Sequence, residues 1–89
     1  LNDPLFIAHL HDVAAEGLAF CTNWVDQGED PLPYWRMRLF GWHGWCVAAN
    51  TWGHDAGTTF TGRSAILGPG GAPLARAERE GDQLLIADL

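Results

Sequence analysis

The chain has 89 residues, which suffices for one small domain or for part of a larger one. Hydrophobic residues make up 47% of it, and the longest uninterrupted apolar run is only residues 45–49, so the chain is neither disordered nor able to span a bilayer. Five Arg, no Lys and 11 acidic residues give a formal net charge of −6, which argues against nucleic acid or an anionic membrane as a partner, because phosphate groups require clustered cations.

Helix-like and strand-like segments alternate in the first third of the chain. Asp3-Pro4 predicts a helix start, because Asp can accept hydrogen bonds from free amides and Pro is tolerated where no N–H is needed. Apolar residues then recur at helical spacing, and Gly17 is the expected stop. A short apolar strand over residues 18–21 follows, closed by residues 22–24, before a polar loop over residues 26–33.

A second helix and a buried strand are expected in the middle of the chain. Residues 34–43 read as the helix, and its core face, at positions i, i+4 and i+7, consists of Trp35, Leu39 and Trp42. Residues 45–50 are apolar on both faces, which is typical of a buried central strand.

The last part of the chain is rich in strands. Residues 51–59 read as a loop, residues 64–77 as a hairpin with its turn at residues 68–71, and residues 83–89 as one more strand. Alternation first and strands later predict an α/β fold with a mixed sheet. Because the chain does not begin with Met and ends in strand-like sequence, we expect residues 1–89 to be a fragment of one larger domain.

The two cysteines are candidates for nucleophilic chemistry, but nothing in the sequence activates them. Cys21 stands at the carboxyl end of a predicted strand, where α/β proteins place their sites, yet no His has a spacing that brings it near. Cys46 lies inside the apolar strand. We therefore favour buried, unpaired thiols over catalysis for both. So low a cysteine count is typical of a reducing compartment and predicts a cytoplasmic location.

No spacing in the sequence matches a set of metal or phosphate ligands. His9 and His11 are two apart on the predicted helix and point in different directions, and neither Cys-x-x-Cys nor His-Glu-x-x-His occurs. His54-Asp55 is interpreted as a solvated turn rather than as a substrate-orienting pair. The glycine-rich residues 68–71 do not open a helix, so they lack the amides of a phosphate cradle. No metal site is expected.

Five short motifs follow one another along nearly the whole chain. They are an apolar strand ending in Thr-Asn-Trp, an apolar strand ending in Ala-Asn-x-x-Gly, the motif Phe-x-Gly-x-Ser, the motif Ile-x-x-Pro-x-Gly-x-x-Leu-Ala, and a closing strand after Glu-Gly. In this chain they stand at residues 17–24, 47–53, 60–64, 66–75 and 80–89. In this order they resemble the C-terminal half of the nitrilase superfamily of carbon–nitrogen hydrolases. The Asp-Pro pair and the Thr-x-Trp form are similar to its biotinidase/pantetheinase branch.

The resemblance implies the C-terminal part of the family's four-layer αββα sandwich, no cofactor, and a catalytic set of Glu, Lys and Cys. The family's nucleophile precedes the helix that here begins near Asp3-Pro4, so we expect the catalytic set to lie outside this chain. It also implies that Asn23, with Thr22 and Trp24, borders the substrate pocket, because this loop lies beside the nucleophile in the family. The alternative for Asn23 is a cap on the turn that follows it.

We therefore expect part of an amide- or nitrile-cleaving enzyme with a Cys thioester or thioimidate intermediate, inactive as this chain alone. The intact protein is expected to take a small-molecule substrate and to be a homo-oligomer. One alternative is a non-catalytic dimerisation or binding module from a truncated nitrilase-like protein. Another is a carbohydrate-binding module, although Trp35 and Trp42 on the predicted core face favour packing. An upstream Cys, Glu and Lys would distinguish the enzyme from both.

Overall fold

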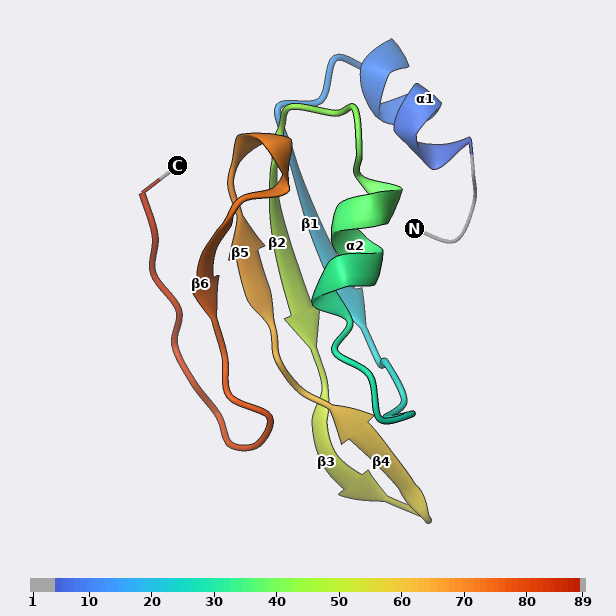
Figure 1. Cartoon of the computed structure of the whole chain (residues 1–89), viewed down its shortest axis with the longest axis vertical. Coiled ribbons are helices and arrows are strands. Elements are labelled where there is room, and N and C mark those ends of the chain that lie inside the picture. Colours follow the sequence, from blue (N-terminus) through green and yellow to red (C-terminus); the bar gives the residue numbers. More distant parts are fainter. Residues whose placement is uncertain (1–4, 89) are drawn as a thin grey trace.

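The computed structural model describes residues 5–88 (Figure 1). The helices are α1 Phe6–Asp12 and α2 Leu32–Arg38, each of 7 residues. Neither is long and apolar enough to cross a membrane, and this holds for all the residues described. The strands are β1 Gly17–Thr22, β2 Trp45–Asn50, β3 Trp52–Asp55, β4 Thr58–Thr61, β5 Ala65–Leu67 and β6 Pro73–Arg76, with a 3-10 turn at Pro69–Gly71.

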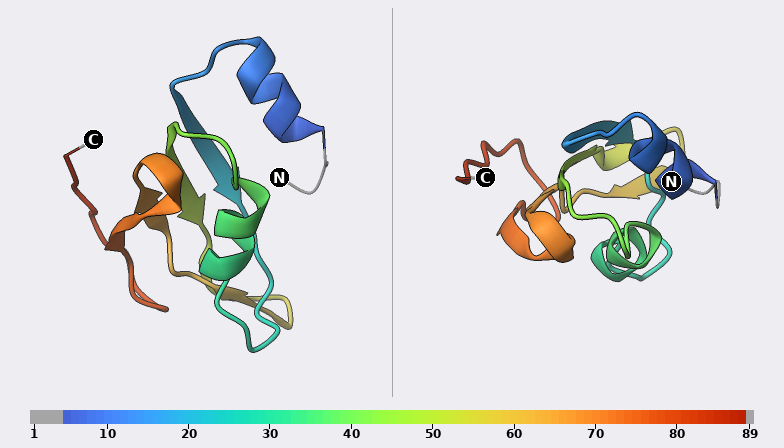
Figure 2. Two further views of the ribbon diagram at one scale, coloured as in Figure 1. Left: turned by 45° about the horizontal axis from the view of Figure 1, so that its top comes forward. Right: turned by 90° about the horizontal axis from the view of Figure 1, so that it is seen from above.

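A four-stranded mixed sheet carries the fold, which confirms the predicted α/β class. Its strand order is β1-β2-β5-β6, in which β1 and β2 are parallel and the other two pairs are antiparallel. Helix α2 connects the two parallel strands, as a parallel pair requires, and packs across one face of the sheet with α1 beside it (Figure 2). The remaining strands, β3 and β4, form a separate two-stranded hairpin.

The hydrophobic core lies between the helices and one face of the sheet. Cys46 and Ala48, alternate residues of the inner strand β2, are each only 1% exposed. The three residues predicted to form a helical core face are also buried, which confirms that part of the prediction and argues against an open aromatic platform. The core cluster consists of Leu10, Leu32, Trp35, Leu39, Trp42, Cys46, Ala48, Ala65 and Leu67.

Helix α2 begins and ends earlier than predicted. It starts at Leu32 because a proline is tolerated in the first turn of a helix, where its missing N–H has no partner to lose. It stops at Arg38 rather than at residue 43, and Gly41, with φ of 89°, lies in the turn that follows. Trp42 is therefore not helical. Its burial comes from tertiary packing, in which its indole Nε1 donates to the Ala15 carbonyl oxygen at 3.3 Å.

Helix α1 also ends before the predicted stop. Its last residue is Asp12, and Ala14 rather than Gly17 takes the left-handed conformation, with φ of 52°. Gly17 is instead the first residue of β1, where a Cβ atom would stand 2.0 Å from the Trp45 indole. The glycine is needed for this close approach and not for a helix stop. The predicted helix start at Asp3-Pro4 lies outside the described residues.

Two predictions about the later strands are wrong and one is confirmed. Residues 51–59, read as a loop, contain all of β3 and the first residues of β4. Residues 83–88, expected to form a strand, have no ladder partner within the described part of the chain and run back past β6 (Figure 1). The hairpin of β5 and β6 is present as predicted, and Gly70 and Gly71 turn it with φ of 77° and 81°.

The sheet face opposite the helices is open over β1 and the end of β2 within residues 5–88, whereas Ile66 of β5, in register with Val47, is buried there. Ala19, Cys21 and Ala49 are exposed there and Val47 is half-buried. Strand β2 is thus buried on one face only, not on both as its composition predicted. A sheet with helices on one side and small apolar residues on the other is compatible with one half of an αββα sandwich, in which a second sheet covers the free face.

Truncating Trp42 to Ala should destabilise the protein by about 3–5 kcal/mol, because it removes a fully packed aromatic ring and leaves a cavity. Urea denaturation followed by circular dichroism measures the loss. The matched control is His43→Ala, the next residue, where the side chain is exposed and the change should stay within about 0.5 kcal/mol. Equal effects of the two substitutions would contradict the assigned core.

Candidate functional site

The predicted site residues lie at the edge of the sheet where the two parallel strands end. Thr22, the last residue of β1, is in register with Asn50, the last residue of β2. Open α/β sheets gather ligands at the carboxyl ends of their parallel strands. Asn23 and Trp24 continue the chain from this edge, so the three predicted residues lie together where β1 passes into the following loop.

The side chain of Asn50 holds this loop against strand β4. Its Oδ1 accepts a hydrogen bond from the backbone N–H of Trp24 at 2.9 Å, and its Nδ2 donates to Thr61 Oγ1 and to the Gly62 carbonyl oxygen, both at 2.7 Å. An Asn amide offers one acceptor oxygen and two N–H groups, so each is engaged. The backbone N–H of Asn50 is bound as well, by Ser64 Oγ at 2.8 Å.

Trp24 turns its ring toward helix α2 rather than toward the open edge of the sheet. The ring centroid lies 5.0 Å from that of Tyr34 and 6.3 Å from that of Trp35, the second pair meeting edge to face at 86°. Thr22 is half-buried as well. Of the three predicted site residues, only Asn23 is exposed to solvent.

The side chain of Asn23 reaches across to the connection between β2 and β3. The hydroxyl group of Thr51 donates a hydrogen bond to Asn23 Oδ1, and the backbone N–H of Thr51 donates to the Thr22 carbonyl oxygen at 3.1 Å. The hydrogen-bond partner of the Asn23 side chain is therefore Thr51, 28 residues away. In the alternative interpretation, Asn23 would instead cap the turn that directly follows it.

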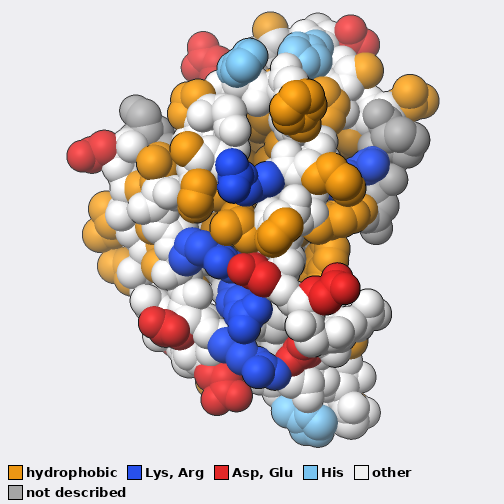
Figure 3. Space-filling view, in the orientation of Figure 1, with side chains coloured by type: hydrophobic (Ala, Val, Ile, Leu, Met, Phe, Trp, Pro, Cys, Tyr) orange, Lys and Arg blue, Asp and Glu red, His pale blue; other side chains and the backbone are white. Residues whose placement is uncertain are grey.

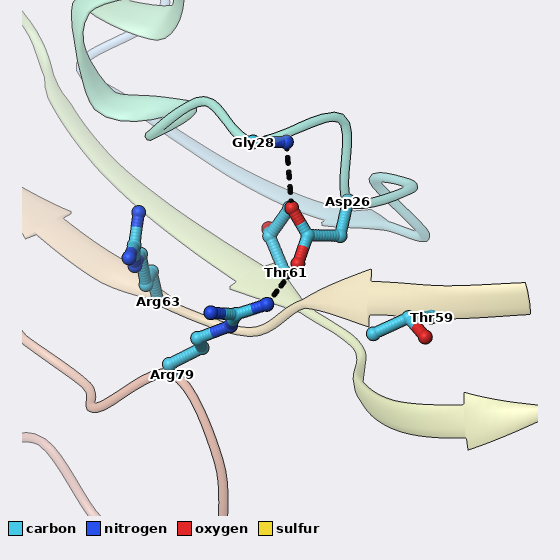
Figure 4. A pocket seen from close by; sticks show the side chains of 6 residues that line it. All are labelled: Asp26, Gly28, Thr59, Thr61, Arg63 and Arg79. Carbon is cyan, nitrogen blue, oxygen red and sulfur yellow. Dashed lines mark hydrogen bonds and ion pairs between the residues drawn. The ribbon is translucent and has the colours of Figure 1, made fainter.

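A polar hollow of about 420 Å³ lies beside the loop and is lined by an ion pair (Figure 4). Asp26 accepts a hydrogen bond from the Gly28 N–H at 2.8 Å and pairs with the Arg79 guanidinium. The Gly28 N–H, followed by the charge of Arg79, holds the pKa of Asp26 below its ordinary value. The lining residues are Asp26, Gly28, Thr59, Thr61, Arg63 and Arg79.

A second ion pair ties the loop before α2 to strand β6. Two nitrogens of the Arg76 guanidinium donate to the two carboxylate oxygens of Asp30 at 2.7 and 2.8 Å, the bidentate geometry that Arg favours. Asp30 also accepts from the Leu32 N–H at 3.0 Å. The bonds from Arg76, and then that from Leu32, hold the pKa of Asp30 below its ordinary value. Arginine and acidic side chains gather on this face of the molecule (Figure 3).

The two cysteines occupy contrasting environments. Cys46 is buried in the core, and burial raises the pKa of its thiol to about 11. A thiol in this state is inert near neutral pH, as expected from the sequence. Cys21 is exposed on the open face of the sheet, which differs from the buried position expected for it.

The histidines do not assemble into a site in the part of the chain that the structure covers. Across residues 5–88 no group of three His, Cys, Asp or Glu side chains could hold a metal ion. His9 and His11 are both exposed on α1. His54 lies in β3 rather than in a turn, and its Nδ1 is 2.9 Å from Thr59 Oγ1 across the hairpin.

Sequence reasoning missed the two residues that organise the loop, Asn50 and Thr51. Their signal was a pair of polar residues directly after an apolar strand, matching the Thr22-Asn23 pair after the previous strand. Parallel pairing brings such strand ends together. Which of these polar groups bond to one another is decided only by the register of β1 with β2.

The fold and this strand-end loop define the chain as an α/β protein with a mixed sheet. Comparison with known families identifies the family to which it belongs. The family model described as carbon-nitrogen hydrolase matches residues 3–89, nearly the whole chain. The chain therefore belongs to the carbon–nitrogen hydrolase family. A search of curated proteins found no match.

Solved structures share the fold. A mutant of the amidase from Nesterenkonia AN1, of the nitrilase superfamily, matches with a TM-score of 0.75 and 24% identity over 88% of this chain and 30% of the amidase. A second mutant of that enzyme, with the same values, carries the acetamide moiety of fluoroacetamide on its active-site cysteine. A carbon-nitrogen hydrolase from Helicobacter pylori G27 matches with a TM-score of 0.69 and 18% identity over 90% of this chain and 34% of that protein. This chain thus spans about a third of the length of these proteins.

Iodoacetamide at pH 8 should alkylate Cys21 in the 89-residue chain and leave Cys46 unmodified, because only an accessible thiolate reacts. Peptide mass spectrometry identifies the labelled residue. Cys46 should become reactive in guanidinium chloride, because unfolding both exposes the thiol and removes the burial that raises its pKa. Labelling of Cys46 at a rate equal to that of Cys21 in the native chain would contradict its assigned burial.

Proposed function

We propose that this chain is the C-terminal part of a carbon–nitrogen hydrolase domain that cleaves an amide, or a nitrile, through a cysteine nucleophile. The observation that carries the proposal is the family match over residues 3–89. The cysteine adduct described for the Nesterenkonia amidase supports the same chemistry for the whole protein. The likeness to the biotinidase/pantetheinase branch stays a prediction.

The proposed reaction divides between this chain and the part of the enzyme that carries the catalytic Glu, Lys and Cys. The Cys thiolate would add to the amide carbon, the amine would leave with a proton from the general acid, and water would hydrolyse the resulting thioester to the acid. A nitrile would pass through a thioimidate. This chain has no Lys, and the environments of Cys21 and Cys46 give no support for either as the nucleophile.

The role proposed for this chain is to shape the substrate pocket at the carboxyl ends of β1 and β2. Asn23 is the exposed polar group there, and we assign it to substrate binding. Thr22 and Trp24 border the same pocket through their backbone, since the Trp24 ring packs against α2.

We further propose that the intact enzyme is a cytoplasmic homo-oligomer acting on a small molecule, without a cofactor and without nucleic-acid or membrane partners. Support for association comes from Met37, in the last turn of helix α2, and Phe40, just after the helix, which are 60% and 87% exposed. Apolar side chains of this size are disfavoured on a free surface and favoured at an interface between subunits. The net charge of −6 supports the absence of a polyanionic partner.

Replacing Asn23 by Ala in the full-length protein should lower kcat/KM by about 1.5–3 kcal/mol of transition-state energy, because a hydrogen bond to the substrate is lost. Steady-state assays on acetamide, valeramide, glutaramate and propionitrile measure the effect. The melting temperature should stay close to that of the wild type. The matched control is Gln27→Ala, another exposed amide in the same connection, which should leave kcat/KM unchanged. Unchanged kinetics together with a lowered melting temperature would make Asn23 a structural residue.

The 89-residue chain alone should hydrolyse none of these four compounds, because the proposed catalytic set lies outside it. Product analysis for released ammonia, with the full-length protein as the positive control, checks this. Turnover by the isolated chain that disappears in Cys21→Ser would overturn the assignment. If the full-length protein proves inactive and lacks an upstream Cys, Glu and Lys, a non-catalytic binding module becomes the better description.

A further inference from the structure

One hydroxyl group holds the side chain of Asn23 in a single orientation. An Asn amide presents a carbonyl oxygen on one side and an NH₂ group on the other. In the structure Thr51 Oγ1 donates to Oδ1 of Asn23, while Nδ2 has no protein partner among residues 5–88. Both N–H groups of this exposed side chain are therefore free to meet a ligand.

The surroundings of Thr51 explain why Asn23 presents its oxygen to it. A threonine hydroxyl has one proton to donate. The other acceptor in reach is the Thr22 carbonyl oxygen at 3.4 Å, beyond the range of about 2.5–3.0 Å for a good O–H···O bond. That carbonyl already accepts from the backbone N–H of Thr51. The closer contact is to Asn23, so the hydroxyl proton is directed to Asn23 Oδ1, which accepts it.

Thr51 is itself held on both sides. Its carbonyl oxygen accepts from the Gly62 N–H at 2.9 Å, and its N–H is bound to Thr22. Its chain neighbour Asn50 is anchored through all of its side-chain polar groups. The hydroxyl group therefore starts from a fixed backbone and sets the amide of Asn23 rather than following it.

We propose that Thr51 is a positioning residue that makes Asn23 a hydrogen-bond donor, so that the substrate group bound at this edge is an acceptor, a carbonyl or carboxylate oxygen. This inference rests on the proposed role of Asn23 in binding the substrate. A substrate group with only protons to offer would meet the two N–H groups of Nδ2 and leave donors unpaired on both sides, which costs affinity.

The kinetic test compares Thr51→Val with Thr51→Ser in the full-length protein, on whichever of the four compounds named above is hydrolysed fastest. Valine keeps the shape of threonine but lacks the hydroxyl group, so kcat/KM should fall roughly tenfold as the amide turns freely. Serine keeps the hydroxyl group and should restore most of the activity. Both variants should melt within a few degrees of the wild type. Equal activity of Thr51→Val and wild type would overturn the positioning role.

A second pair of variants tests the direction of the hydrogen bond. Asn23→Ala removes the donor, whereas Asn23→Asp puts acceptor oxygens where the donor stood and repels an acceptor on the substrate. We expect Asn23→Asp to be less active than Asn23→Ala. An Asp variant that is more active than the Ala variant would mean that the substrate donates at this position, contrary to the proposal.

Glutaramate and valeramide distinguish the two kinds of acceptor, because they are of equal length and differ in a terminal carboxylate. If Asn23 binds the carbonyl oxygen that is attacked, Asn23→Ala should lower kcat/KM equally for both. If it binds the carboxylate, only glutaramate should be affected. Either outcome supports an acceptor, whereas a loss confined to valeramide would contradict it.

A readout that does not depend on activity separates this inference from the proposed function. NMR of the Asn23 side-chain amide should show fast solvent exchange for both Nδ2 protons, since neither is bonded to the protein. Protection of one proton that is lost in Thr51→Val would show that Nδ2 faces Thr51, which overturns the inference. If both Nδ2 protons exchange fast but Asn23→Ala has the kinetics of the wild type, the inferred orientation of the Asn23 amide is correct. In that case only its proposed role in substrate binding is refuted.

Discussion

The amide of Asn50 joins the parts of the chain on which the candidate site depends. Its oxygen binds the backbone of Trp24 after β1, and its nitrogen binds Thr61 and Gly62 where β4 ends. Each of these hydrogen bonds contributes about 1 kcal/mol in net terms, and losing the amide would leave several partly buried groups unpaired at once. One residue at the end of the inner strand thus sets the path of the loop that carries Asn23.

The sheet around this residue has two different faces. Side chains that alternate along β2 put Cys46 and Ala48 into the core beneath the helices and Val47 and Ala49 on the other side. The second set is small and apolar, and within residues 5–88 Val47 is half-buried and Ala49 is exposed. Such a surface is suited to close packing against another sheet, which agrees with a family whose members are sandwiches of two sheets between helices.

Family membership and proposed function rest on different observations. The family match covers nearly all of the chain, and the solved structures share its fold, yet this chain spans about a third of their length. Within that third, Asp26 with Arg79 and Asp30 with Arg76 form ion pairs that fasten loops to β6 and the turn after it. They stabilise the frame of the site, whereas the chemistry that we propose belongs to residues beyond it. What we propose that this chain offers to a substrate is the exposed amide of Asn23.

The sequence by itself determined the class of fold, the inner strand and the family. Residues 45–50 were predicted at their observed limits, because a run of apolar residues between a Gly and a polar pair is a local signal. The burial of Trp35, Leu39 and Trp42 was predicted from their i, i+4, i+7 spacing, and all three are buried although the helix already ends at Arg38.

Only the tertiary structure decided how these parts meet. Trp42 lies outside the helix, and its burial comes from tertiary packing, in which the Ala15 carbonyl oxygen accepts its indole N–H. Strands β3 and β4 pair although neither alternates clearly, and bonds from the distant segment 24–26 to Thr59 and Thr61 support them. The orientation of Asn23 depends on a hydroxyl group 28 residues away. Local sequence predicts where a polar residue ends a strand, but the register between strands, a long-range property, decides which group faces it.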